Sequence, residues 1–184
     1  MVPFAGYELP VLYKGDKGGV MKEHLHCRSH AGLFDVSHMG QIIWKGKDRH
    51  AFLEKLVVGD IQGLKPGSGT LSLVTNAHGG IIDDTVITNY DDYIYMVVNG
   101  ATKFGDMKHF QSMMQEYPEM DVSMEYLEDR MQLLAVQGPE AATSIARLLS
   151  DGFDLTNMAF MTGTEVTLDG IDGCRITRYV VLTN

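Results

Sequence analysis

The chain has 184 residues, of which 45% are hydrophobic and 21% charged, and its 24 acidic and 15 basic side chains give a formal net charge of −9. This length is enough for a globular domain with a real core, and no apolar run approaches the ~20 residues that a membrane span needs. The acidic balance, without any cluster of Lys or Arg, argues against a nucleic-acid partner, and two distant cysteines without a secretory signal favour a reduced compartment.

The N-terminal segment predicts a packed loop or short strand followed by a helix. Residues 1–12 combine prolines and a glycine with apolar side chains, and residues 20–31 have helical spacing that Gly32 would end. The helix carries His26, Cys27 and His30, which are zinc-ligand types. Because Cys27 has no CxxC partner and no second ligand pair follows at zinc-site spacing, a partly exposed polar helix face is the favoured interpretation, and no metal site is expected.

Strand composition follows in the segment LFDVSHMGQIIWKG, residues 33–46. Asp35, Ser37 and His38 are the residue types of a hydrolase triad, but Ser37 lacks the flanking glycines of a nucleophile elbow. The favoured alternative is that Asp35 and Ser37 satisfy backbone donors at a strand end or turn.

The centre of the chain predicts three consecutive antiparallel strands. A helix over residues 49–57 is followed by a strand over 70–75, a turn over 76–80, a strand that starts close to Ile81, and a third strand over 93–99. Strands that are adjacent in sequence tend to pair in space, so we expect a meander.

The second of these strands, in the stretch GGIIDDTVITNY, carries two adjacent carboxylates. Side chains alternate across a strand, so Asp83 and Asp84 must point to opposite faces. At least one then lies on a face of Ile, Val and Thr and needs hydrogen-bond donors or a cation, as a functional carboxylate does. The alternative is a solvated pair that caps an edge-strand turn. Asn99 ends the neighbouring strand, where its amide could both donate to and accept from a heterocycle.

The remaining elements complete an α+β fold. We predict a helix over residues 101–117 with Phe104, Met107 or Lys108, Phe110 or Gln111 and Met114 on its inner side, strands over 122–126 and 131–136 around a turn, a helix over 141–149 and a hairpin of 164–168 with 174–177. The elements lack regular βαβ spacing, which favours mostly antiparallel sheets with packed helices.

Seven motifs together resemble, in order, those of the T-protein family of the glycine cleavage system, the tetrahydrofolate-dependent aminomethyltransferases. They are VPFAGYELPV, LFDVSHMGQI, LVVGDI, GTLSLVTNAHGGIIDD, YMVVN, LAVQGPEAA and MAFMTG. The resemblance implies the folate-binding domain of that family over residues 1–178. It also implies transfer of an aminomethyl group from the lipoyl arm of the H-protein to tetrahydrofolate, with release of ammonia and formation of 5,10-methylenetetrahydrofolate.

The resemblance also implies which residues act. Asp84, the second Asp of the GGxxDD motif, takes the place of the family's pterin-binding acid and would orient the folate and assist proton movement. Met39, Leu71, Val97 and Asn99 fall on positions that line the folate. Asp84→Asn is therefore expected to remove activity with little loss of fold, and Asp83→Asn to be milder.

Two features qualify the resemblance. After Arg178 the glycine- and tyrosine-rich segment of the family is replaced by the divergent tail 179–184, and the segment that usually precedes the start is missing, so we expect an incomplete domain. The alternative function is an inactive fragment that only binds folate or a protein partner such as the H-protein. A folate-dependent demethylating relative would normally add a flavin domain, and no GxGxxG fingerprint supports one. The motifs look closer to eukaryotic T-proteins, which suggests mitochondria although no transit peptide is present.

Overall fold

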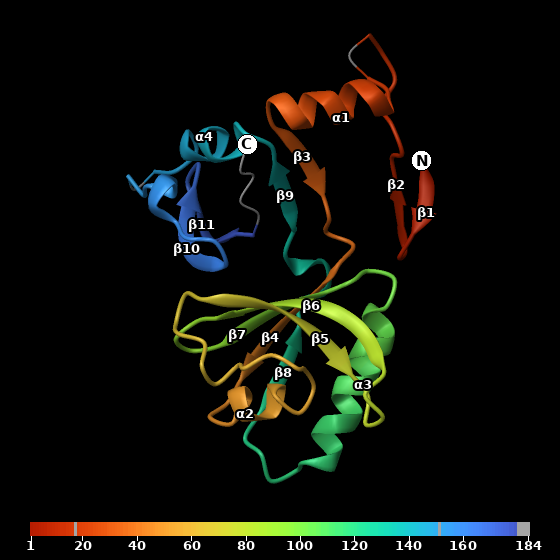
Figure 1. Cartoon of the computed structure of the whole chain (residues 1–184), viewed down its shortest axis with the longest axis vertical. Helices are drawn as coiled ribbons and strands as arrows, with labels where there is room; N and C mark the ends of the chain where they lie inside the picture. The colour runs from red at the N-terminus through yellow and green to blue at the C-terminus, as the bar shows by residue number, and fades with distance from the viewer. Residues whose placement is uncertain (17, 151, 180–184) are drawn as a thin grey trace. The chain divides into compact units, whose positions relative to one another are not determined.

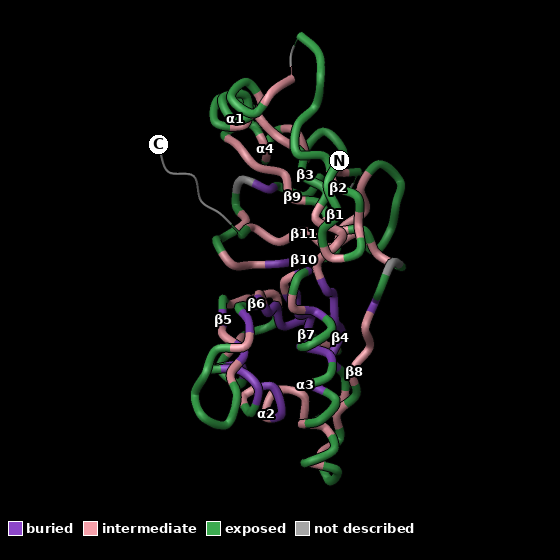
Figure 2. The backbone as a smooth tube through the Cα atoms, turned by 90° about the vertical axis from the view of Figure 1, so that its right-hand side faces the viewer, coloured by how far each residue is buried: buried purple, intermediate pink, exposed green. Residues whose placement is uncertain are grey.

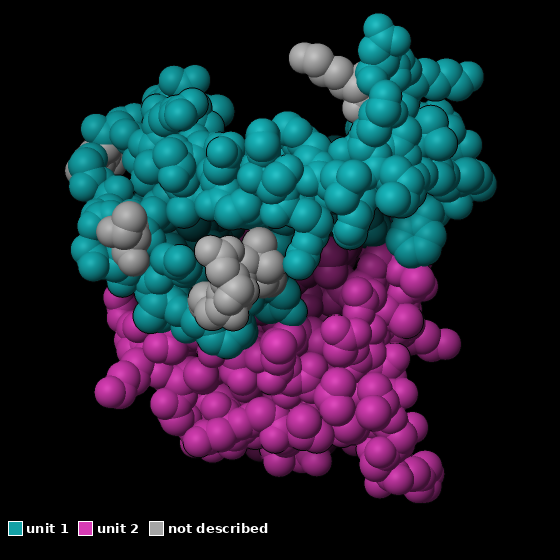
Figure 3. Space-filling view, turned by 45° about the horizontal axis from the view of Figure 1, so that its top comes forward, with its two compact units in different colours: residues 1–38, 132–184 teal, residues 39–131 magenta. Residues whose placement is uncertain are grey.

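A computed structural model describes residues 1–16, 18–150 and 152–179 of the chain. The chain divides into two compact units, which Figure 3 shows in different colours. Unit 1 contains residues 1–38 and 132–184, and unit 2 contains residues 39–131. The expected tail at 179–184 lies outside the described residues except for Tyr179.

Unit 2 is built on a five-stranded antiparallel sheet with the order β5-β6-β7-β4-β8 (Figure 1). The strands are β4 (Gly40–Lys45), β5 (Gly69–Thr75), β6 (Ile81–Asn89), β7 (Ile94–Val98) and β8 (Ser123–Tyr126). The predicted meander is confirmed as β5-β6-β7. Asn76 closes the β5–β6 turn by accepting the N–H groups of His78 and Gly80 at 2.9 Å, and Gly79 takes a φ of 77°, which a residue without Cβ adopts at little cost.

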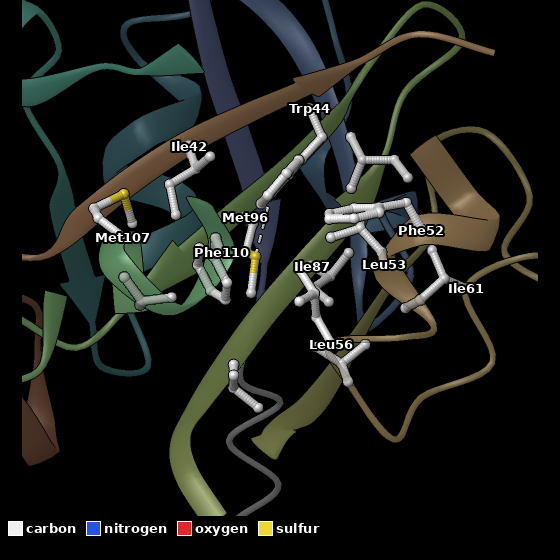
Figure 4. Close-up of a cluster of buried hydrophobic side chains, with 14 residues drawn as sticks. Ile42, Trp44, Phe52, Leu53, Leu56, Ile61, Ile87, Met96, Met107 and Phe110 are labelled. Atoms are coloured by element: carbon white, nitrogen blue, oxygen red, sulfur yellow. Dashed lines mark hydrogen bonds between the residues drawn. The ribbon is translucent and has the colours of Figure 1, made fainter. Parts of the chain in front are cut away.

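Two helices, α2 (Arg49–Leu53) and α3 (Lys103–Glu116), supply the side chains that cover one face of this sheet. The sheet contributes Ile42, Trp44, Ile87 and Met96, and the helices contribute residues such as Phe52 and Phe110 (Figure 4). The Trp44 indole N–H donates to the Met96 sulfur at 3.4 Å. Buried backbone concentrates in α2, β4, β7 and the second half of β6 (Figure 2).

The helix predicted over residues 49–57 ends early, at Leu53. Beyond it, Val57 forms an isolated bridge with Val74, and the Thr75 N–H donates to the Leu56 carbonyl at 3.1 Å. The chain keeps turn bonds up to the Val57 N–H, which donates to the Leu53 carbonyl at 2.9 Å, and bonds to the edge strand then take the place of further helix turns.

Unit 1 consists of short two-stranded ribbons and helices. Its elements are β1 (Val2–Phe4), β2 (Tyr7–Leu9), α1 (Val20–Ser29), β3 (Gly32–Asp35), β9 (Leu134–Gln137), α4 (Ala141–Ala146), η2 (Leu155–Asn157), β10 (Thr162–Leu168) and β11 (Ile171–Arg178). The pairs are β1-β2, β3-β9 and β10-β11, all antiparallel. The predicted C-terminal hairpin is confirmed as β10-β11.

The end of α1 differs from the prediction because Gly32 begins β3 and does not cap the helix. A Cβ at Gly32 would come within 3.2 Å of the Cys27 sulfur and 3.1 Å of the Phe34 ring, so the glycine permits close packing. The strands predicted over 122–126 and 131–136 exist as β8 and β9, separated by η1 (Glu128–Arg130), but they pair with β4 and β3 and not with each other.

The antiparallel pairing throughout the described ladders confirms the predicted α+β class. No helix in the described ranges is both long enough and apolar enough to cross a membrane.

Candidate functional site

The face of the unit 2 sheet opposite α2 and α3 carries a row of side chains across four strands. Leu71 on β5 lies opposite Val86 on β6, Val86 opposite Val97 on β7, and Val97 opposite Gln41 on β4. Directly opposed residues of an antiparallel pair point to the same face, so Leu71, Val86 and Val97 form an apolar strip. The strip runs from an open edge, where Leu71 is 54% exposed, to a covered centre, where Val97 is 8% exposed.

Three of the five predicted folate-contact residues, Leu71, Asp84 and Val97, share this face, because Asp84 lies two positions before Val86 on β6. Met39 directly precedes β4 and Asn99 directly follows β7, so strand alternation does not place these two side chains. Asp84 and Asn99 are brought into direct contact, because the Asn99 amide Nδ2 donates to Asp84 Oδ1 at 2.7 Å. Their contact with folate stays a prediction.

The two adjacent aspartates differ, as the strand alternation predicts. Asp84 is exposed, whereas Asp83 is 7% exposed and lies on the face toward the helices. Asp83 accepts three hydrogen bonds: from the Asn99 backbone N–H at 2.9 Å, from Asn99 Nδ2 at 2.8 Å and from the Thr102 hydroxyl at 2.9 Å. The buried carboxylate that needed donors is therefore Asp83, and Asp84 is the one accessible to a ligand.

The hydrogen bonds keep Asp83 ionised in spite of its position. Burial opposes the charged form, but the donors from Asn99 and Thr102, together with the Asp84 backbone N–H, hold the pKa of Asp83 below its usual value. Asp83 thus ties the end of β7 to the start of α3 through a charged carboxylate that accepts three hydrogen bonds.

Asn99 is oriented by both carboxylates. Its Nδ2 group donates to Asp83 Oδ1 and to Asp84 Oδ1, and a flipped amide would place its oxygen against two carboxylate oxygens. The oxygen Oδ1 of Asn99 accepts no hydrogen bond from the described residues, nor does Asp84 Oδ2. The site consequently offers a ligand two acceptors and no amide donor. Asn99, which was expected both to donate and to accept, can therefore only accept.

A third carboxylate, Asp106 on α3, lies behind Asp83 and was not found by sequence reasoning. Its residue is 0% exposed. Burial, reinforced by the Asp83 charge beside it, raises the pKa of Asp106 from 3.8 to about 7.

The inner side of α3 differs from the expected stripe. The buried residues are Lys103, Asp106, Met107 and Phe110, at spacing i, i+3, i+4 and i+7, whereas Phe104 is 70% exposed. The sequence prediction for Phe104 is wrong because two of the inward positions hold charged residue types, which hides the helical period from a count of apolar residues. The signal that could have revealed this inner side is the spacing of Lys103 and Asp106, which are three residues apart on the helix.

Asp35 and Ser37 take the backbone-bonding roles that the sequence favoured over a hydrolase triad. Asp35 Oδ1 accepts the Ser37 N–H at 3.0 Å, and the Ser37 hydroxyl accepts the Leu133 N–H at 3.0 Å, so both serve backbone donors. The His38 ring packs against Phe4 with centroids 5.3 Å apart. In the described part of the chain, no three His, Cys, Asp or Glu side chains gather closely enough to hold a metal ion.

Comparison with known proteins identifies the family. The model described as "GCVT N-terminal domain" matches residues 1–180. The chain belongs to this family. A GCVT N-terminal domain accounts for the order of motifs from β1 to β11 and includes every residue of the candidate site.

Three relatives of this GCVT N-terminal domain are named as aminomethyltransferases. The mitochondrial aminomethyltransferase of Dictyostelium discoideum is 50% identical over 182 residues, which cover 97% of this chain and 44% of that protein. The mitochondrial aminomethyltransferase of Homo sapiens is 43% identical, with 97% and 43% covered. The crystal structure of glycine cleavage system aminomethyltransferase T from Bartonella henselae superposes with a TM-score of 0.79 at 34% identity, over 90% of this chain and 43% of that one. The chain spans less than half the length of these relatives.

Proposed function

We propose that this chain is the tetrahydrofolate-binding part of an aminomethyltransferase of the glycine cleavage system. One observation carries the proposal: in a GCVT N-terminal domain, two adjacent acceptors, Asp84 and Asn99, lie beside an apolar strip that is exposed at its β5 edge.

The chemistry of this surface fits a reduced pterin. A pterin is flat and presents N–H donors along one edge, so its ring can lie against Leu71, Val86 and Val97 while its donor edge meets Asp84 Oδ2 and Asn99 Oδ1. A hydrogen bond to an ionised carboxylate is worth ~1.5–3 kcal/mol, which makes Asp84 the largest single contributor in this arrangement. Met39 directly precedes β4 and is the remaining predicted contact.

The reaction would use this orientation. The substrate tetrahydrofolate forms N5–C and N10–C bonds to the methylene carbon, the C–S bond to the lipoyl arm and the C–N bond to the amine break, and the two protons lost from N5 and N10 leave on ammonia and on the lipoyl thiol. Asp84 would hold the ring so that N5 meets the carbon, and would assist the proton movement.

The partner and compartment follow from the same assignment. The aminomethyl group would arrive on a lipoylated H-protein, and the curated relatives are named as mitochondrial, so we place the chain in mitochondria.

The test is a calorimetric titration of the 184-residue chain with tetrahydrofolate, beside Asp84→Asn. Asp92→Asn, an exposed Asp in the β6–β7 turn, is the matched control. We expect saturable binding by the wild type and the control, and affinity at least about ten-fold weaker in Asp84→Asn. No binding by a folded wild-type chain would overturn the proposal. Binding without transfer from aminomethyl-loaded H-protein would support the alternative of a fragment that binds folate without turnover.

A further inference from the structure

Asp106 has no role in the proposed function, and its hydrogen bonding is unusual. Its carboxyl group is completely buried, and no N–H or O–H of the described residues donates to either of its oxygens. Its polar neighbours are the Asp83 carboxylate and the Thr102 hydroxyl. The single proton of that hydroxyl is committed to Asp83 Oδ2 at 2.9 Å, with the Asn99 carbonyl at 3.2 Å as the alternative. An ionised Asp106 would be a buried charge without a donor.

Protonation of Asp106 resolves the problem. A neutral carboxylic acid carries one O–H, and an acceptor for it is present in the Asp83 carboxylate. Asp83 in turn accepts both N–H groups of Asn99, and the Asn99 amide reaches Asp84. With that O–H donated to Asp83, a continuous chain of hydrogen bonds would run from the buried acid on α3 to the exposed carboxylate on β6.

We propose that Asp106 is a positioning residue of the candidate site: as a neutral acid it donates a hydrogen bond to Asp83, and this bond holds the Asn99 amide with its oxygen toward the ligand. The inference rests on the proposed function for the identity of that ligand. Asp106 itself touches neither Asn99 nor Asp84 through a hydrogen bond, so its effect is transmitted through Asp83.

Ionisation of Asp106 would reverse this effect. Two adjacent buried carboxylates repel each other, and Asp83 would lose a donor while it still holds Asn99. Around Asp106, β6 carries Asp83 and Asp84, and β4 carries Lys45, whose ammonium lies 3.3 Å from Glu125 on β8. The other titratable or charged side chains of α3 are Lys103, Lys108, His109 and Glu116. β5 and β7 carry no Asp, Glu, Lys, Arg or His. Asp83 is the charge that acts on Asp106 most strongly.

The test follows the Asp106 carboxyl carbon and the Asn99 side-chain amide by NMR in the ligand-free chain, from about pH 5 to about pH 9. We expect both signals to move with one midpoint near 7. Asp106→Asn keeps an N–H donor that cannot titrate, so it should hold Asn99 at its low-pH position throughout. Asp106→Leu, which removes the donor, should displace the Asn99 signals at every pH.

Tetrahydrofolate titrations supply the second readout. If only the protonated form is competent, wild-type affinity falls about ten-fold between about pH 6 and pH 8. In Asp106→Asn the affinity should stay near the wild-type pH 6 value. Asn99 signals that ignore the Asp106 titration, or a wild-type pH profile retained by Asp106→Asn, would overturn the inference. Both outcomes can be read even if Asp106→Leu fails to fold.

The two proposals fail separately. If the wild type binds no tetrahydrofolate at any pH, the proposed function falls, and the ligand-free NMR titration still decides whether Asp106 controls Asn99. If the folate binds and Asp84→Asn abolishes binding while Asn99 ignores Asp106, the proposed function stands and this inference falls.

Discussion

The two faces of the unit 2 sheet are made from the same strands and differ in what their side chains do. The face toward α2 and α3 carries Ile42, Trp44, Ile87 and Met96, all 0% exposed. Truncation of these side chains would lower the free energy of unfolding. The opposite face carries the exposed side chains of Leu71 and Asp84, whose truncation would lower ligand affinity. Because the period of a strand is two, neighbouring residues such as Asp83 and Asp84 fall on different sides of this division.

The largest expected effect is on the helix-covered face. Phe110→Ala removes a fully buried ring that packs against Trp44 with centroids 5.6 Å apart. We expect it to lower the free energy of unfolding by about 3–5 kcal/mol, measured by urea denaturation. A loss below about 1 kcal/mol would show that this face is not the core of unit 2.

Asp106→Asn should give the next largest effect, and its sign depends on pH. The pKa of Asp106 is about 7 in the folded chain and 3.8 unfolded, so the folded state binds more protons in between. Wild-type stability contributed by this group is present below pH 3.8 and is lost as the pH rises through about 7. The variant removes this slope and should be more stable than the wild type at about pH 8, by no more than about 4 kcal/mol. Equal slopes in urea denaturation from about pH 4 to pH 8 would contradict the buried-acid assignment.

Asp83→Asn sharpens the comparison between the two aspartates. Replacing one carboxylate oxygen by an NH2 group leaves a donor from Asn99 or Thr102 without an acceptor, which costs about 1–3 kcal/mol of unfolding free energy. The same change at Asp84 should cost less than about 0.5 kcal/mol. The expectation that Asp83→Asn is milder than Asp84→Asn for activity stays a prediction, whereas for stability Asp83→Asn should be the more damaging change. Equal losses of stability would remove the distinction.

The smallest expected effect on stability is at the open edge. Leu71→Ser should change the free energy of unfolding by less than about 0.5 kcal/mol, because Leu71 is 54% exposed. It should nevertheless weaken tetrahydrofolate binding about three- to ten-fold through lost apolar contact. Phe104→Ser, at a side chain that is 70% exposed on α3, is the control that should leave binding unchanged.

Sequence reasoning predicted what is local. Alternation and turn residues were sufficient for the β5-β6-β7 meander and for the opposite placement of Asp83 and Asp84. The pairing of β8 with β4 and of β9 with β3 joins residues about 80 to 100 positions apart, and nothing in the local pattern of either strand specifies such a partner.

Only part of the candidate site was predicted, because the rest depends on contacts between strands that the local pattern does not specify. A family resemblance supplied Asp84 and Asn99, but their hydrogen bond and the acceptor-only surface depend on the register between β6 and β7. Asp106 was missed because it is a charged residue type at an inward helix position, where periodicity predicts an apolar side chain.

The most direct test of the account is a methyl-labelled NMR titration of the chain with tetrahydrofolate. We expect shifts that saturate together at Leu71, Val86, Val97 and Met39, with Ile42, Met96 and Met107 nearly unmoved, because Leu71, Val86 and Val97 share the face opposite the helices and the last three lie in the core. Shifts confined to the core methyls, with Leu71 and Val97 unchanged, would contradict the assignment of this face as the folate site.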